Sequence, residues 1–389
     1  MEFLSVCNQR EGKRKAWIGY LYLTAIFLVV FRLFAYLSCF KMGAWTVYAF
    51  TMATALLFFV IAMLSFPEFS VWERVLWLGL IGSTLISWLT HFTALEYICN
   101  TAILLGSLTC LTRVQWKKSY ADLLFLVFSV YTLFVAIFVN RNIIDVDSFV
   151  YMNPNVASLL FVVYQFVLVA YARKQDNKPL KIVCYIVAIG LIFVQWQFGG
   201  RASLLGTGVL VVYFALQKFF DKYKVRTIWW LIVSLSVFAV IFALLYSVVL
   251  YRLLGDDVPV LGKDLFSGRE KIWLEAFKSL GGGKIFFGTG QQLLFIPWNG
   301  SLEPTNLHSS MIGYLTLFGV FTAVFYALLL ATLTAKSGKG KRKTLVAFIV
   351  AMIVLSYFET FLYSTNSVLY FPIAFTLIYH FDNETRSEK

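Results

Sequence analysis

Long apolar runs set the strongest limit on what this chain can fold into. A helix needs about 20 consecutive apolar residues to cross the hydrocarbon layer of a membrane, and only helices or closed barrels can cross it. The runs are continuous rather than alternating in polarity, so they predict helices and not the strands of a barrel. We predict about twelve transmembrane helices, at 17–40, 44–65, 73–90, 93–112, 120–139, 156–172, 180–198, 202–219, 227–250, 306–334, 344–362 and 367–380.

The composition agrees with this interpretation. Hydrophobic residues make up 60% of the 389 positions and charged residues 14%, whereas soluble domains have about 45–50% apolar and about 25% charged residues. We therefore predict an all-α polytopic membrane protein in which residues 1–389 form a single transmembrane domain.

The positions of the basic residues predict the topology. If the chain crosses the membrane at every run, more than two thirds of the 33 Lys and Arg residues fall on the side of the N-terminus. Basic loops are retained in the cytoplasm, so both termini are predicted to be cytoplasmic. The net charge of +13 is thus explained by short loops between apolar runs, and we expect no nucleic-acid partner.

One long polar segment, 251–305, falls on the opposite side, between the ninth and tenth runs. We interpret it as a large extracytoplasmic loop subdomain that contains an amphipathic helix. Ser267 followed by Glu270 has the spacing of a capping box, which would start this helix, and Gly281-Gly282-Gly283 would end it.

Arg269 is the first candidate for chemistry in this loop. On a helix it would share a face with Ile272, Trp273 and Ala276, and would point toward the protein or the membrane. A guanidinium on an apolar face needs an anionic partner, and its planar fork matches phosphate or carboxylate oxygens. The alternative is an arginine that reaches to water or headgroups. Trp273 is a further substrate-binding candidate.

Arg201 is the second candidate. It follows Gly199 and Gly200 in a tight outer turn between the seventh and eighth runs, and Ser203 lies in the next helical turn. Glycines allow a close backbone approach, and an ionisable residue at this depth is a functional candidate by default. The alternative is an interfacial arginine that touches lipid phosphate.

His308 lies in the first turn of the tenth run, two residues after Asn306. A helix N-terminus disfavours the imidazolium, so a neutral His308 could act as a general base. Glu359, near the outer end of the eleventh run, could orient His308 or take a hydroxyl proton. The alternatives are an interfacial histidine and a structural ion pair.

Weaker candidates and absent motifs complete the list of expectations. Asn155 opens the sixth run on the outer side, where it could bind substrate or cap the helix, and Arg141 lies in the preceding loop. The chain has no Walker, HExxH or GxSxG motif, and its five cysteines form no disulfide or metal-binding pattern. We expect no metal and no cofactor.

A series of short motifs around the polar segment resembles the O-antigen polymerase/O-antigen ligase superfamily. The similarity covers roughly 150–320, and it extends to the expected topology of many spans with one large late outer loop. The motifs are Asn153-Pro154-Asn155, Gly199-Gly200-Arg201-Ala202-Ser203, Ser267-Gly268-Arg269 with Trp273, Gly288-Thr289-Gly290, and Asn306-Leu307-His308-Ser309-Ser310 before Leu315, Phe318 and Gly319.

The resemblance implies a metal-independent membrane glycosyltransferase of the C type in the bacterial inner membrane. Its donor and acceptor would be undecaprenyl-diphosphate-linked glycans, and a chain-length regulator is a further expected partner. It implies that Arg201 and Arg269 hold the diphosphate and that His308 assists the acceptor hydroxyl. One departure is that family members often have His-Asn after the loop, whereas Ser309 follows His308 here.

Three functions remain open from the sequence. The first is a polymerase that joins lipid-linked repeat units into O-antigen or capsular polysaccharide at the outer face of the membrane. The second is a ligase that moves finished polymer to an acceptor. The third, from another class, is a polysaccharide-lipid transporter or flippase, which would place its charged groups near the midplane rather than at one face.

Overall fold

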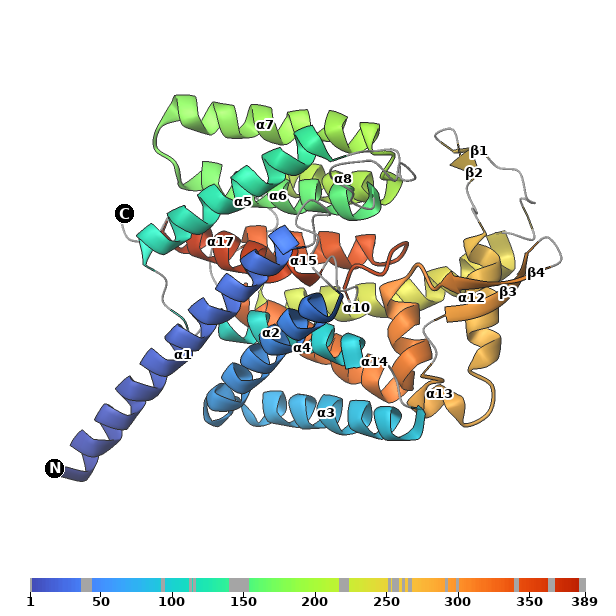
Figure 1. Cartoon of the computed structure of the whole chain (residues 1–389), viewed down its shortest axis with the longest axis horizontal. Coiled ribbons are helices and arrows are strands. Elements are labelled where there is room, and N and C mark those ends of the chain that lie inside the picture. The colour runs from blue at the N-terminus through green and yellow to red at the C-terminus, as the bar shows by residue number, and fades with distance from the viewer. Residues whose placement is uncertain are drawn as a thin grey trace.

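The computed structural model describes residues 2–35, 44–91, 95–111, 114, 117–139, 154–216, 224–250, 253, 259–260, 263–264, 268–290, 293–298, 301–338, 343–362 and 368–384. Within these ranges the chain forms a helical bundle with two small antiparallel hairpins at one end (Figure 1). The first half contains α1 (Glu2–Ala35), α2 (Ala44–Ser65), the 3₁₀ turn η2 (Phe66–Glu68), α3 (Val71–His91), α4 (Leu95–Cys110), α5 (Lys118–Phe138), α6 (Pro154–Lys174) and α7 (Lys178–Gln197). The second half contains α8 (Arg201–Ala215), α10 (Val225–Leu244) with the π-helical turn η3 (Leu245–Leu250), β1 (Pro259–Val260), β2 (Lys263–Asp264), α12 (Arg269–Ser279), α13 (Lys284–Phe287), β3 (Leu293–Trp298), β4 (Ser301–Asn306), α14 (Ser310–Ser337), α15 (Lys343–Leu355) and α17 (Tyr370–Glu384).

Seven helices within the described ranges are long and apolar enough to cross a membrane. They are α1, α2, α5, α6, α7, α10 and α14, and the shorter apolar helices α4, α8 and α15 accompany them. The chain therefore belongs to the predicted class of helical, multi-pass membrane proteins. Each of the twelve predicted runs overlaps a helix, but that all twelve cross the membrane stays a prediction.

Helix α6 is the centre of the bundle. Every residue from 156 to 170 is buried, and the helix packs against α5, α7, α8, α15 and α17. A helix that is apolar on all sides is stable only where other helices surround it. Its first turn, at Asn155, therefore has a fixed position relative to most of the molecule.

Two of the predicted straight spans are interrupted. Helix α14 is broken at Gly319, whose φ of 82° and ψ of 178° are not helical, and the bend is visible in Figure 1. Helix α15 ends at Leu355, so residues 356–362 of the eleventh predicted run are turn and irregular backbone. The prediction failed there because apolar composition reports the surroundings of a segment and not the conformation of its backbone.

The segment between α10 and α14 contains the predicted amphipathic helix, α12. It buries Ile272, Trp273 and Ala276 and ends in a turn at the three glycines. The predicted capping box is wrong, because the N-cap is Gly268, which has a φ of 79° and makes no side-chain cap. Glu270 is instead turned inward and buried. The extracytoplasmic location of this segment stays a prediction.

The groups predicted to share one side of the membrane lie together. Arg14 Nη2 is 2.7 Å from Glu68 Oε1, and Lys336 Nζ is 2.9 Å from Glu73 Oε1, which joins four segments of the predicted inner face. Helix α1 lies on the left of Figure 1, and α12 and the hairpins lie on the right. The bundle therefore has two chemically distinct ends.

Candidate functional site

The candidate site is centred on the carboxylate of Glu359, in the irregular segment after α15. Its Oε1 accepts hydrogen bonds from Arg269 Nη2 at 2.9 Å and from Asn155 Nδ2 at 3.1 Å. Its Oε2 lies 3.6 Å from His308 Nδ1. Four predicted site residues from four separate segments therefore meet at one point.

The side chains of this cluster differ in how much of their surface is exposed to solvent. The side chain of Glu359 is 9% exposed, that of Arg269 is 19% exposed and that of His308 is 36% exposed. A buried carboxylate is stable only with partners, and Arg269 and Asn155 supply them. The anionic partner that the sequence demanded for Arg269 is thus provided by the chain itself.

The backbone of His308 is strained. Its φ is 48°, and no other non-glycine residue among the described positions has a positive φ. Such conformations cost roughly 1–3 kcal/mol and persist where the surroundings enforce them, as at active sites. The residue before it is held tightly, because the fully buried Trp273 donates from Nε1 to Leu307 O at 2.8 Å. Trp273, expected as a substrate contact, therefore positions the backbone.

The irregular segment that carries Glu359 is fastened to the start of α14. Ser310 donates from N to Ser356 O at 2.9 Å and from Oγ to Glu359 O at 3.0 Å, while its Oγ accepts from Leu362 N at 3.1 Å. Ser309 Oγ adds a bond to Ser356 O at 3.3 Å. The two serines therefore hold the His308 and Glu359 backbones in register. The sequence motif contained them but did not predict this function.

Arg201 is the first residue of α8, and its side chain lies outside the described part of the structure. Its N-cap, Gly200, presses on the start of α6, since a Cβ there would lie 2.3 Å from Ser158 Oγ. Ser158 is about one helical turn after Asn155 in α6, so the start of α8 lies near Asn155. Ser203 is buried and donates to Gly200 O at 2.6 Å. Its hydroxyl closes the turn, and that Ser203 binds substrate stays a prediction.

Two other predicted site residues stay predictions, because their side chains lie outside the described part of the structure. Asn306 ends β4, where it pairs with Leu293, and its side chain is outside the described part. Arg141 lies entirely outside the described residues.

A buried amide network that the sequence did not predict supports the α8 start. Gln165 Oε1, in α6, accepts from Gln195 Nε2 at 3.0 Å and from Thr207 Oγ1 at 2.8 Å. It joins α6, α7 and α8 on either side of the turn that carries Arg201. Isolated glutamines within apolar runs were the available signal, because amides in lipid need partners.

The Gly288-Thr289-Gly290 motif closes the break in α14. Thr289 N donates to Thr316 O at 2.7 Å and Gly290 N donates to Leu317 O at 3.2 Å. These carbonyls lie in the last turn before Gly319, where the break removes their helical donors. The loop therefore caps the short first part of α14, residues 310–318, which begins next to His308.

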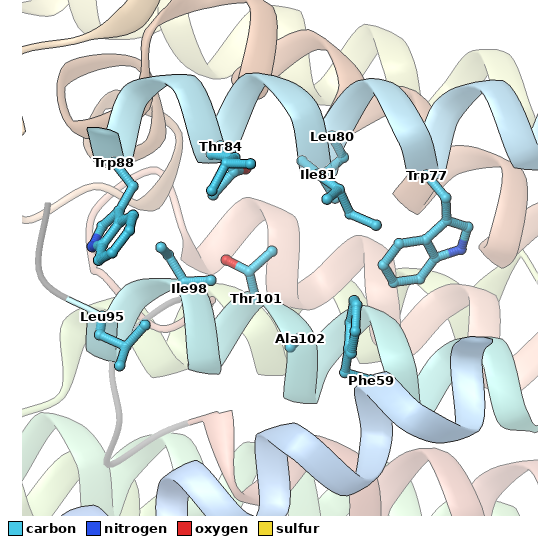
Figure 2. Close-up of a pocket in the computed structure, with 11 residues that line it drawn as sticks. Phe59, Trp77, Leu80, Ile81, Thr84, Trp88, Leu95, Ile98, Thr101 and Ala102 are labelled. Carbon is cyan, nitrogen blue, oxygen red and sulfur yellow. The ribbon is translucent and has the colours of Figure 1, made fainter. Parts of the chain in front are cut away.

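An apolar groove lies apart from this cluster. It has a volume of about 300 Å³, runs along α3 from Trp77 to Trp88, and holds no titratable side chain (Figure 2). Its lining comes from α2, α3 and α4. Thr101 in this lining hydrogen-bonds Tyr314 OH on the first part of α14 at 2.6 Å.

Within the described residues, no group of three or more His, Cys, Asp or Glu is arranged to hold a metal ion. Comparison of the chain with family models and with curated proteins finds no match. The functional interpretation therefore depends on the chemistry of the Glu359-centred cluster.

Proposed function

We propose that this chain is a membrane glycosyltransferase that polymerises lipid-diphosphate-linked oligosaccharide repeat units into a polysaccharide. The observation that carries the proposal is the meeting of Arg269, His308 and Asn155 on Glu359, where α15 has unwound and the His308 backbone is strained. A cation to bind the leaving diphosphate and an imidazole to take the hydroxyl proton are groups that a displacement at a sugar diphosphate can use.

The positions of the helix ends support an anionic substrate. Asn155, Arg201 and Arg269 each lie at the first or second position of a helix, and His308 lies two residues before another. Helix N-termini carry partial positive charge and bind phosphate readily. The cationic side chains add to this field, so a diphosphate is the substrate group that fits.

The proposed reaction balances without a cofactor. The acceptor hydroxyl oxygen forms a bond to the anomeric carbon of the donor, and the bond from that carbon to the diphosphate oxygen breaks. The diphosphate leaves with the electron pair, and Arg269 and Arg201 stabilise the charge that develops on it. The hydroxyl proton goes to His308, whose Nε2 is free to accept it because Nδ1 faces Glu359.

The decisive experiment uses purified protein in nanodiscs with lipid-linked repeat units extracted from cells that make them. We expect a glycan ladder from the wild type. His308→Ala should slow its formation about 10²–10⁴-fold, and Arg269→Ala should slow it about 10²–10³-fold, as loss of one charge-stabilising group does.

Lys278→Ala is the matched control, because Lys278 is a cation of the same helix that pairs with Glu275 on the exposed face. It should leave the ladder unchanged. A ladder that persists in both site variants would overturn the assignment of the site. Transfer to a non-lipid-linked acceptor instead would indicate a ligase, and movement of the lipid across the bilayer without a ladder would indicate a transporter.

A further inference from the structure

The carboxylate of Glu359 is hydrogen-bonded to Arg269 and Asn155 through Oε1, but its other oxygen, Oε2, has not closed on His308. Arg269 is bound at 2.9 Å, whereas His308 Nδ1 is 3.6 Å away, beyond the usual N–H···O range of about 2.7–3.2 Å. In the position set by its bonds to Arg269 and Asn155, the carboxylate leaves Oε2 just beyond hydrogen-bond distance of His308.

Arg269 is also the group that a diphosphate would bind. Its side chain is partly exposed, and a guanidinium binds phosphate through paired, charge-assisted hydrogen bonds. Glu359 then competes with the substrate for the same cation. Two anions on one guanidinium repel each other, so binding of the phosphate weakens the bond to Glu359.

We propose that Glu359 is a positioning residue that exchanges partners when the donor binds. This inference rests on the proposed function. Arg269 turns from Glu359 to the diphosphate, and the released carboxylate closes on His308 Nδ1. A carboxylate at Nδ1 fixes the proton there and leaves Nε2 as the acceptor, as in other carboxylate–histidine pairs. The general base is thus completed only in a site that holds a donor.

The surroundings of Glu359 allow its side chain to move while its backbone stays in place. Glu359 is in irregular backbone, but Ser310 holds its carbonyl at 3.0 Å, so only the side chain has to move. The movement to His308 is under about 1 Å, given the usual hydrogen-bond length. Asn155 donates to Oε1 at 3.1 Å and can stay bound throughout, so the carboxylate keeps a partner.

Glu359→Gln tests the exchange because it removes the competing charge and keeps the shape. The probe is undecaprenyl diphosphate without sugar, titrated onto the protein in nanodiscs, with turnover measured separately by the glycan ladder. We expect the variant to bind the probe on the order of tenfold more tightly, the gain from about one charge-assisted contact. Its turnover should fall about 10²-fold, because His308 loses its carboxylate.

Glu275→Gln is the control, since it makes the same chemical change on the exposed face of α12. It should alter neither affinity nor turnover. A merely structural Glu359 predicts weaker binding and lower turnover together in Glu359→Gln, and that result, or unchanged binding, would overturn the exchange. Failure of the wild type to bind the probe would instead overturn the proposed function itself.

A second measurement uses only the wild-type protein, so it does not depend on whether a variant folds. The chain has three histidines, so a ¹⁵N-histidine spectrum of the wild type is simple enough to assign. Addition of undecaprenyl diphosphate should shift the ring nitrogens of one histidine toward a single tautomer with the proton on Nδ1. A spectrum that does not change while the probe binds would contradict the exchange.

Discussion

At His308 the backbone adopts a conformation that a side chain disfavours. The residue lies between β4 and α14, and its neighbours Leu307 and Ser310 are both held by hydrogen bonds to other segments. The strain is therefore imposed by the fold, and stability is given up at a residue whose ring is 36% exposed on the edge of the cluster. Such a loss is expected where function, not packing, selects the side chain.

This leads to a prediction about two variants of His308. His308→Gly should be more stable than His308→Ala by about 1 kcal/mol, because glycine adopts positive φ without strain. Both should lose turnover. Thermal unfolding in detergent and the glycan ladder measure the two effects. Equal stability of the two variants would show that the His308 backbone is not strained.

A second prediction concerns Asp382, at the end of the bundle away from the site and just beyond the last predicted span. Its carboxylate is buried and accepts from Thr344 Oγ1 at 2.9 Å and from Leu345 N at 3.4 Å. Burial raises the pKa of Asp382 from 3.8 to about 6, although the charge of Arg173 opposes this. The folded state then binds the proton more tightly than the unfolded state.

Stability from this group is therefore fully present below about pH 4 and is lost as the pH rises through about 6. The loss is on the order of 3 kcal/mol. Asp382→Asn should lack it, so the difference in unfolding midpoint between wild type and variant should change over this interval and be constant above it. A difference that is independent of pH would contradict the buried, protonatable carboxyl.

At the scale of elements, the break in α14 is the feature that builds the site. Gly319 ends the first part of the helix, residues 310–318, and Gly288 and Gly290 bring the loop close enough to cap it. All three have positive φ, and a Cβ at Gly319 would lie 2.3 Å from Phe286 O. Breaks in membrane helices are tolerated only where other groups satisfy the freed carbonyls, and Thr289 and Gly290 do so here.

Gly319→Ala should therefore destabilise the protein by roughly 3 kcal/mol, from backbone strain and overpacking together. Gly190→Ala in α7 is the matched control, because nothing lies within 4 Å of a Cβ at that position. It should be neutral or slightly stabilising. Thermal unfolding of both variants in the same detergent makes the comparison, and equal midpoints would show that α14 does not need the break.

The sequence predicted the positions of the helices and part of the candidate site, but it did not predict where the helices break. Apolar runs located the helices, because lipid exposure and burial both select apolar side chains. The helical face of Arg269 predicted its inward direction, and Glu359 was named as a partner for His308. The breaks at Gly319 and after Leu355, and the internal function of Ser203, could not be predicted, because they arise from contacts between segments distant in sequence.

At the scale of the whole molecule, two different groups of charged residues lie at the two ends of the bundle. Basic residues of the predicted inner loops pair with Glu68 and Glu73, and the Glu359 cluster lies at the start of α6, α12 and α14. The distribution predicts that the site opens away from the cytoplasm, where only a donor that is already activated on a lipid is available.

Cysteine labelling in intact cells checks this orientation. Lys278→Cys, on the exposed face of α12, should react with a membrane-impermeant maleimide. Lys178→Cys, at the exposed first residue of α7, should react only after the cells are opened. The parent protein is the background control for its native cysteines, of which Cys99, Cys110 and Cys184 are buried. The reverse pattern would invert the topology.

The capped break in α14 also has a consequence for how the chain is made. Thr289 lies 27 residues before Thr316, whose carbonyl it caps, so the cap leaves the ribosome before the helix that needs it. If this loop lies outside the cytoplasm as predicted and has not crossed the membrane when α14 enters, the carbonyls of Thr316 and Leu317 have no donors in lipid. On the predicted topology, we expect the bend that places His308 to form only after the loop has been translocated and folded, so insertion of the chain and completion of the site would belong to the same biosynthetic step.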